Sequence, residues 1–114
     1  MDCEITSCRA SYDLGFSLEN LVYLELLRRG YKVMIGRIGN TEVDFVAEKQ
    51  GAYTYYQVTA DMTAQETFER EMRPLAQIRD NYEKIILTAD RLTVGNYNGI
   101  RVKNLTDWLL DKEN

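Results

Sequence analysis

Hydrophobic and polar residues alternate through residues 41–47, a pattern typical of a β-strand with one buried face. Val43, Phe45 and Ala47 fall on one predicted face, and Glu42, Asp44 and Val46 fall on the other. Residues 52–59 are rich in aromatic and β-branched side chains and predict a second strand, with Tyr53, Tyr55, Gln57 and Thr59 on one face. Gln50 and Gly51 lie between the strands as a turn, so the two strands are expected to form a hairpin.

The length of this turn sets the register of the hairpin. A two-residue loop at Gln50 and Gly51 pairs Lys49 with Ala52, and counting back along both strands brings Asp44 opposite Gln57. Directly opposed side chains have Cβ atoms roughly 4.5 to 5.5 Å apart, so Asp44 and Gln57 could share a ligand or bond each other. The alternative is an outward-facing polar pair on a half-exposed hairpin.

An amphipathic helix is predicted over residues 18–29, with Ser17 as its N-cap and Gly30 after its end. Val22, Tyr23, Leu26 and Leu27 form its apolar arc, and Glu19 lies in the middle of that arc. A carboxylate that faces a core needs a polar partner, so Glu19 is expected to project toward Asp44 and Gln57. In the alternative, Glu19 faces water and interacts with the helix dipole.

The remaining elements follow from the same patterns. Residues 31–38 predict a strand that completes a three-stranded meander, and residues 83–89, with an unbroken apolar run, predict a central strand covered on both faces. Residues 63–66 have the form of a capping box before a helix that reaches residue 79, with a kink or restart at Pro74. After a turn at residues 97–99, residues 100–103 predict a short strand and residues 105–111 a closing helix capped by Asn104.

Composition excludes several kinds of chemistry. The chain has 114 residues, enough for one domain with its own core, and no histidine, which removes Ser-His and Cys-His nucleophile systems. Cys3 and Cys8 cannot form a zinc site by themselves and are expected to be reduced. The net charge of -4 argues against a broad phosphate-binding surface. Without an apolar run long enough to span a membrane or a signal peptide, the chain is expected to be cytoplasmic.

Four segments of the chain resemble a known family, namely residues 15–31, 42–47 (Glu-Val-Asp-Phe-Val-Ala), 56–58 and 67–71. In this order and spacing they look like the domain of unknown function at the C-terminus of many bacterial and archaeal AAA+ ATPases. The resemblance implies an α/β fold with a restriction-endonuclease-like, or PD-(D/E)XK nuclease-like, core. Its elements would follow the order αβββαβ, with helices on both sides of a central mixed sheet and a closing C-terminal helix. It divides the chain into an arm, residues 1–14, and a nuclease-like domain, residues 15–114.

The same resemblance suggests where a site would lie. Asp44 matches the strand acid that holds Mg²⁺ in active nucleases, and Glu19 matches the helix acid. Gln57 stands where the second metal-binding acid is expected, and Thr59 stands where the catalytic lysine is expected. A neutral amide and a hydroxyl replace two charged groups, which predicts a degenerate site with no cofactor and no cleavage of DNA or RNA.

Two functions from different classes follow from these residues. The first is a non-catalytic module that works through a partner: an AAA+ ATPase domain, another protein or a nucleic acid, but not a membrane, with a homodimer as a further arrangement. The alternative is a Mg²⁺-dependent nuclease that uses Glu19, Asp44 and Gln57 without the usual lysine, with Asp44 and Gln57 as the metal ligands.

Overall fold

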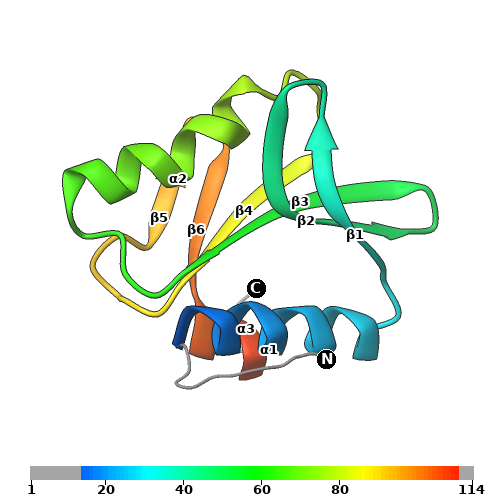
Figure 1. Ribbon diagram of the computed structural model, residues 1–114, viewed down its shortest axis with the longest axis horizontal. Helices are drawn as coiled ribbons and strands as arrows, with labels where there is room; N and C mark the ends of the chain where they lie inside the picture. The colour runs from blue at the N-terminus through cyan, green and yellow to red at the C-terminus, as the bar shows by residue number, and fades with distance from the viewer. Residues whose placement is uncertain (1–13, 111–114) are drawn as a thin grey trace.

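A computed structural model describes residues 14–110 and, except at positions 14–17 and 38, their side chains. In chain order the elements are α1 (Leu14–Arg28), β1 (Lys32–Ile38), β2 (Thr41–Lys49), β3 (Ala52–Thr59), α2 (Gln65–Gln77), β4 (Glu83–Thr88), β5 (Gly95–Tyr97), β6 (Ile100–Asn104) and α3 (Leu105–Leu110). The strands form one six-stranded mixed sheet in the order β1-β2-β3-β4-β6-β5. α2 covers one face of this sheet and α1 and α3 cover the other, which confirms the α/β class (Figure 1).

The sheet changes from antiparallel to parallel at its centre. β1, β2 and β3 form the predicted antiparallel meander, while β4 pairs in parallel with both β3 and β6. Ile85, Ile86 and Leu87 of β4 are almost completely buried, as expected for a strand with helices on both sides. β5 was not predicted, because its three residues carry little apolar pattern.

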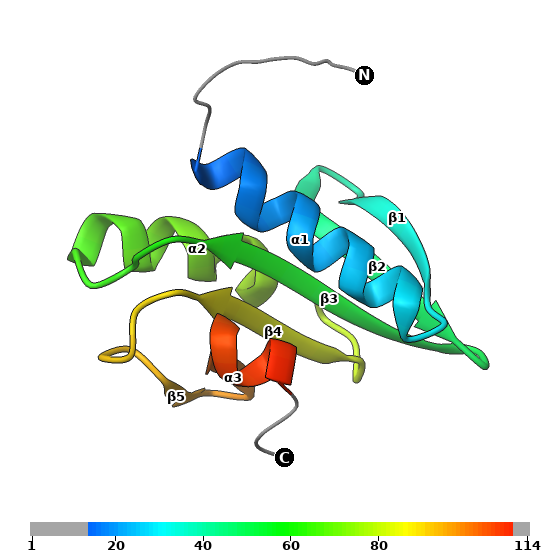
Figure 2. The ribbon, with the colours of Figure 1, turned by 90° about the horizontal axis from the view of Figure 1, so that it is seen from below.

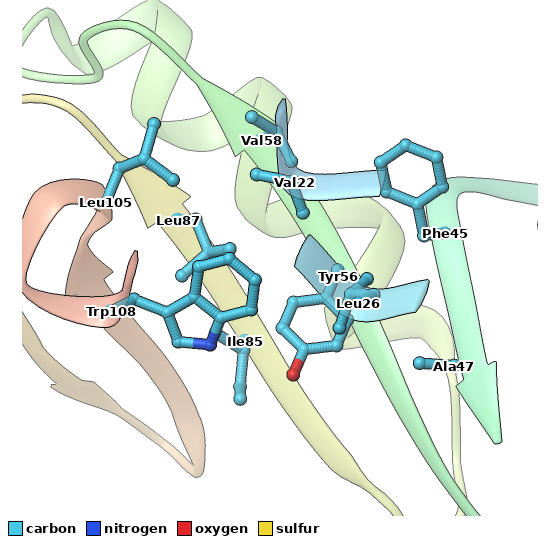
Figure 3. Close-up of a cluster of buried hydrophobic side chains, with 10 residues drawn as sticks. All are labelled: Val22, Leu26, Phe45, Ala47, Tyr56, Val58, Ile85, Leu87, Leu105 and Trp108. Atoms are coloured by element: carbon cyan, nitrogen blue, oxygen red, sulfur yellow. The ribbon is translucent and has the colours of Figure 1, made fainter. Parts of the chain in front are cut away.

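Two apolar clusters hold the helices against the sheet. The cluster below α2 includes Leu75 from α2 and Ile86 from β4. The cluster below α1 and α3 contains Val22 and Leu26 from α1, Tyr56 from β3 and Trp108 from α3 (Figure 3). Arg29 joins the two helices, because its guanidinium lies 4.3 Å from the centre of the Trp108 ring and donates a hydrogen bond of 2.6 Å to the Trp108 carbonyl oxygen. α1 and α3 therefore form one layer on this face (Figure 2).

Only the C-terminal end of α1 agrees with the prediction. The helix begins at Leu14, so Ser17 lies inside it and is not the N-cap. Its C-terminal end is as predicted, since Gly30 has a φ of +93° and Tyr31 N–H donates to the Leu26 carbonyl oxygen at 3.1 Å. The predicted arm lies outside the described residues apart from residue 14, as do Cys3, Cys8 and the end of the closing helix at Asp111.

The predicted capping box before α2 is wrong. Ala64 occupies the N-cap position and has no side-chain group that could cap the helix. Thr63, the predicted cap, instead donates both its N–H and its hydroxyl to the Asp61 carboxylate at 2.8 and 2.6 Å. Pro74 lies inside α2 without a restart of the helix, which ends at Gln77.

α3 has the cap that the sequence predicts. The Asn104 side-chain oxygen accepts the Asp107 N–H at 3.1 Å. None of the helices in residues 14–110 is long and apolar enough to cross a membrane.

Candidate functional site

A β-bulge lies at the centre of the predicted site. The strand pairs on either side of it are Met34 with Val46 and Gly36 with Val43. Between these pairs, Asp44 and Phe45 of β2 together oppose the single residue Ile35 of β1. An extra residue of this kind bends its strand and redirects the side chains beyond it.

The bulge changes which face of the sheet the start of β2 presents. Phe45 and Ala47 pack in the cluster below α1, but Val43 packs in the cluster below α2, so the predicted alternation is wrong at Val43. Gly36 makes this close packing possible, since a Cβ atom at this position would lie 2.3 Å from Val43 Cγ2 and 2.8 Å from Val46 Cγ2.

The hairpin between β2 and β3 has the predicted turn. Gln50 and Gly51 have φ values of 55° and 84°, and Lys49 pairs with Ala52. The ladder continues in this register as far as the pair of Phe45 and Tyr56. The regular pairing stops there, one residue before Asp44 and Gln57.

Asp44 and Gln57 join the two strands beyond the end of this ladder. The Gln57 side-chain oxygen accepts the Asp44 N–H at 2.8 Å, and the Asp44 carboxylate accepts the Val58 N–H at 2.8 Å. The sequence thus predicted the meeting of these residues correctly. Each side chain, however, bonds the backbone of the opposite strand, in place of the backbone-to-backbone bonds that a regular ladder would have.

Glu71 of α2 completes the arrangement. The Gln57 side-chain nitrogen donates to the Glu71 carboxylate at 3.3 Å, and Gln57 itself is only 7% exposed. Glu71 was not identified as a site residue, although the helical spacing of Phe68 and Leu75 places it on the inward side of α2. Gln57 therefore uses both ends of its amide, one toward β2 and one toward α2.

Three carboxyl groups share this region, and their pKa values are raised. Burial, followed by the charge of Asp44, raises the Glu71 pKa to about 7, with Arg70 opposing the shift and Glu19 adding to it. Burial also raises the Asp44 pKa, against the hydrogen bond from Val58 N–H. Ionisation of one of these groups makes ionisation of the others less favourable. The neutral amide of Gln57 avoids a fourth negative charge among them.

Glu19 lies at the edge of the cluster. The residue as a whole is exposed, but partial burial of its carboxyl group and the charge of Asp44 raise its pKa. No hydrogen bond within residues 14–110 joins it to Asp44 or Gln57. Glu19 is thus coupled to Asp44 by charge alone. The predicted apolar arc around it is only half buried: Val22 and Leu26 are buried, and Tyr23 and Leu27 are exposed.

The predicted site residues show few features of a metal site. The described residues contain no group of three or more acidic or cysteine side chains able to hold a metal. The Asp44 and Gln57 oxygens that would be ligands accept backbone N–H groups. Thr59, at the lysine position, donates its hydroxyl to the Asp61 carbonyl oxygen at 3.4 Å, and Lys49 donates instead to the Arg29 carbonyl oxygen at the end of α1.

Comparison with known proteins identifies a relative in Haemophilus influenzae strain Rd, described as an uncharacterized protein. It is 41% identical to this chain over 93 residues, which make up 82% of this chain and 22% of the relative. The match thus spans about a fifth of the length of the relative. No family model matches the chain.

Proposed function

We propose that this chain is a non-catalytic domain with a restriction-endonuclease-like core, similar to the C-terminal domain of AAA+ ATPases, and that it acts by binding a protein partner. The order of its elements and the place of Asp44, Gln57 and Glu19 in the sheet and first helix support this proposal. In this view the former catalytic positions now stabilise the fold.

One observation carries the proposal, namely the two hydrogen bonds by which Asp44 and Gln57 link β2 to β3. The Gln57 side-chain oxygen accepts the Asp44 N–H and one oxygen of the Asp44 carboxylate accepts the Val58 N–H, so both side chains are held by the backbone and have fewer lone pairs left for a metal ion. Thr59 offers no positive charge to stabilise the charge that develops during cleavage. Loss of one such charge stabiliser typically costs about two to three orders of magnitude in rate.

A Mg²⁺-dependent nuclease is the second candidate, and a specific observation favours it. Burial raises the pKa values of Glu19, Asp44 and Glu71, and the charge of Asp44 adds to the rise at Glu19 and Glu71. A divalent cation would relieve this repulsion. In this alternative the Asp44 oxygen that does not accept the Val58 N–H would face the ion. The ion would supply Lewis-acid activation of a water molecule.

The test is a cleavage assay on supercoiled plasmid, single-stranded DNA and RNA in Mg²⁺ or Mn²⁺. Asp44→Asn is the matched control, because asparagine removes the charge but keeps an oxygen that can accept the Val58 N–H. We expect no cleavage by either protein and no shift in thermal unfolding on addition of Mn²⁺. Metal-dependent cleavage that disappears in Asp44→Asn would refute the proposal and establish the nuclease.

A further inference from the structure

The outer face of α1 exposes several large apolar side chains. Val22 and Leu26 are fully buried against the sheet, whereas four large side chains on the other sides of the helix are partly exposed. They are Leu21, Tyr23, Leu24 and Leu27, with exposed fractions of 44, 38, 53 and 43%. One of them, Tyr23, lies at the edge of this face, since its ring also stacks on Phe45 of β2 with 6.0 Å between ring centres. In Figure 2 this helix lies across the near side of the sheet. Clusters of this kind on a protein surface mark interaction sites.

The charges beside this face are paired within the helix. Glu25 accepts hydrogen bonds from Arg28 at 2.8 Å and Arg29 at 2.7 Å, and these bonds, with that of Arg28 first, lower the Glu25 pKa to about 2. A partner that covers the face therefore meets apolar side chains rather than a charge that needs a counterion. An apolar groove is the surface that fits it.

The size of the face indicates what kind of partner can use it. At roughly 200 Å² for a fully exposed large side chain, the four exposed fractions amount to about 350 Å². A stable complex of two separate proteins needs about 800 Å² on each side, of which slightly more than half, about 450 Å², is apolar, so these four side chains fall short of what a second copy of this chain would need. Contacts between domains of one polypeptide begin at about 300 Å² on each side, because the linker supplies a high effective concentration.

The H. influenzae relative suggests which partner could cover this face. Its match to this chain accounts for 22% of its length, so most of that polypeptide lies outside the matched domain. We propose that the outer face of α1, formed by Leu21, Tyr23, Leu24 and Leu27, docks into an apolar groove on a further domain of the kind that makes up the rest of the H. influenzae relative. This inference rests on the proposed function, in which the chain works through a protein partner.

The experiment compares a thiol on α1 in two settings. Leu24→Cys is introduced into the 114-residue protein and into a chimera in which this protein replaces the matched segment of the full-length relative. Maleimide labelling at the introduced position is followed by peptide mass spectrometry. Leu92→Cys, at a position that is 86% exposed in the loop before β5, is the control.

We expect labelling at Leu24→Cys to be at least about tenfold slower in the chimera, while labelling at Leu92→Cys is unchanged; tenfold corresponds to about 1.4 kcal/mol of docking. Equal rates at Leu24→Cys in both settings would overturn the inference.

A second measurement does not depend on the chimera. The labelling rate at Leu24→Cys in the 114-residue protein is expected to be independent of protein concentration. A rate that falls as concentration rises would mean that a second copy covers the face, and would also overturn the inference. Equal labelling rates would refute the docking but would not bear on the proposed lack of nuclease activity. Metal-dependent cleavage that is lost in Asp44→Asn would refute the proposed function, whatever the labelling rates are.

Discussion

Replacing Glu71 with glutamine should make the protein more stable at pH 8. Glu71→Gln keeps a side-chain oxygen that can accept the Gln57 amide at the present 3.3 Å, but removes a negative charge near Asp44 and Glu19. The Glu71 pKa in the folded protein is about 7, above its ordinary value of 4.5. The folded state therefore holds a proton that the unfolded state releases, and the stability that this proton contributes is fully present below pH 4.5 and lost as pH rises through about 7.

The magnitude follows from the size of this shift. A rise of about 2.5 pKa units corresponds to about 3.4 kcal/mol at most, and solvent screening of a partly exposed group reduces it to about 1–2 kcal/mol. We expect Glu71→Gln to raise the free energy of unfolding by that amount at pH 8 and to leave it unchanged at pH 4. In urea denaturation the gain at pH 8 would move the midpoint by about 0.5–1 M.

The matched control is Glu69→Gln on the same helix, where Glu69 is exposed and accepts a hydrogen bond from Gln65 at 3.2 Å. Its difference from the wild type should be small at both pH values. A Glu71→Gln protein that is less stable than the wild type at pH 8, or whose gain is the same at pH 4 and pH 8, would refute the carboxylate-repulsion argument.

Three further changes test other parts of the structure. Gly36→Ala should lower the free energy of unfolding by about 1–3 kcal/mol, because its methyl group would meet Val43 at the bulge, while Gly95→Ala, with its nearest contact at 3.6 Å, should change it by less than about 0.5 kcal/mol. Asp90→Asn should cost about 1–2 kcal/mol at pH 7, because Asp90 accepts several hydrogen bonds; burial would raise its pKa, but these bonds lower it to about 2, so the cost should shrink as pH falls from 3.8 toward 2. Gln57→Glu should cost about 2 kcal/mol at pH 8 and less at pH 4, because it replaces the donor to Glu71 with a fourth acid. Urea denaturation at each pH checks all three, and an unchanged midpoint for any of them contradicts the corresponding contact.

Local patterns in the sequence predicted most of the strands and helices. Gln50 and Gly51 defined a turn with two positive φ values, and that turn sets the pairing of Lys49 with Ala52. The apolar run at Ile85 and its neighbours marked β4, because a strand buried on both faces needs no alternation. These features depend on residues that are close in sequence, which is why they could be predicted.

The bulge at Asp44 could not be predicted in the same way. It depends on the register between β1 and β2, and the residue that permits it, Gly36, belongs to the other strand. Similarly, Ser17 has the chemistry of an N-cap but lies inside a helix that starts at Leu14. The site was predicted as far as the meeting of Asp44 and Gln57, while the role of Glu71 depends on the packing of α2 on the sheet.

The side-chain hydrogen bonds of Asp44 and Gln57 bear on how an acid and an amide at these strand positions are interpreted in a sequence. The Gln57 oxygen accepts the Asp44 N–H and the Asp44 carboxylate accepts the Val58 N–H, so these side chains replace part of the backbone ladder between β2 and β3 whether or not any reaction occurs there. An acid at position 57 would remove the donor to Glu71 and weaken the fold. An aspartate at this position of β2 therefore has a structural role of its own, and its presence in a sequence is by itself no sign of catalysis.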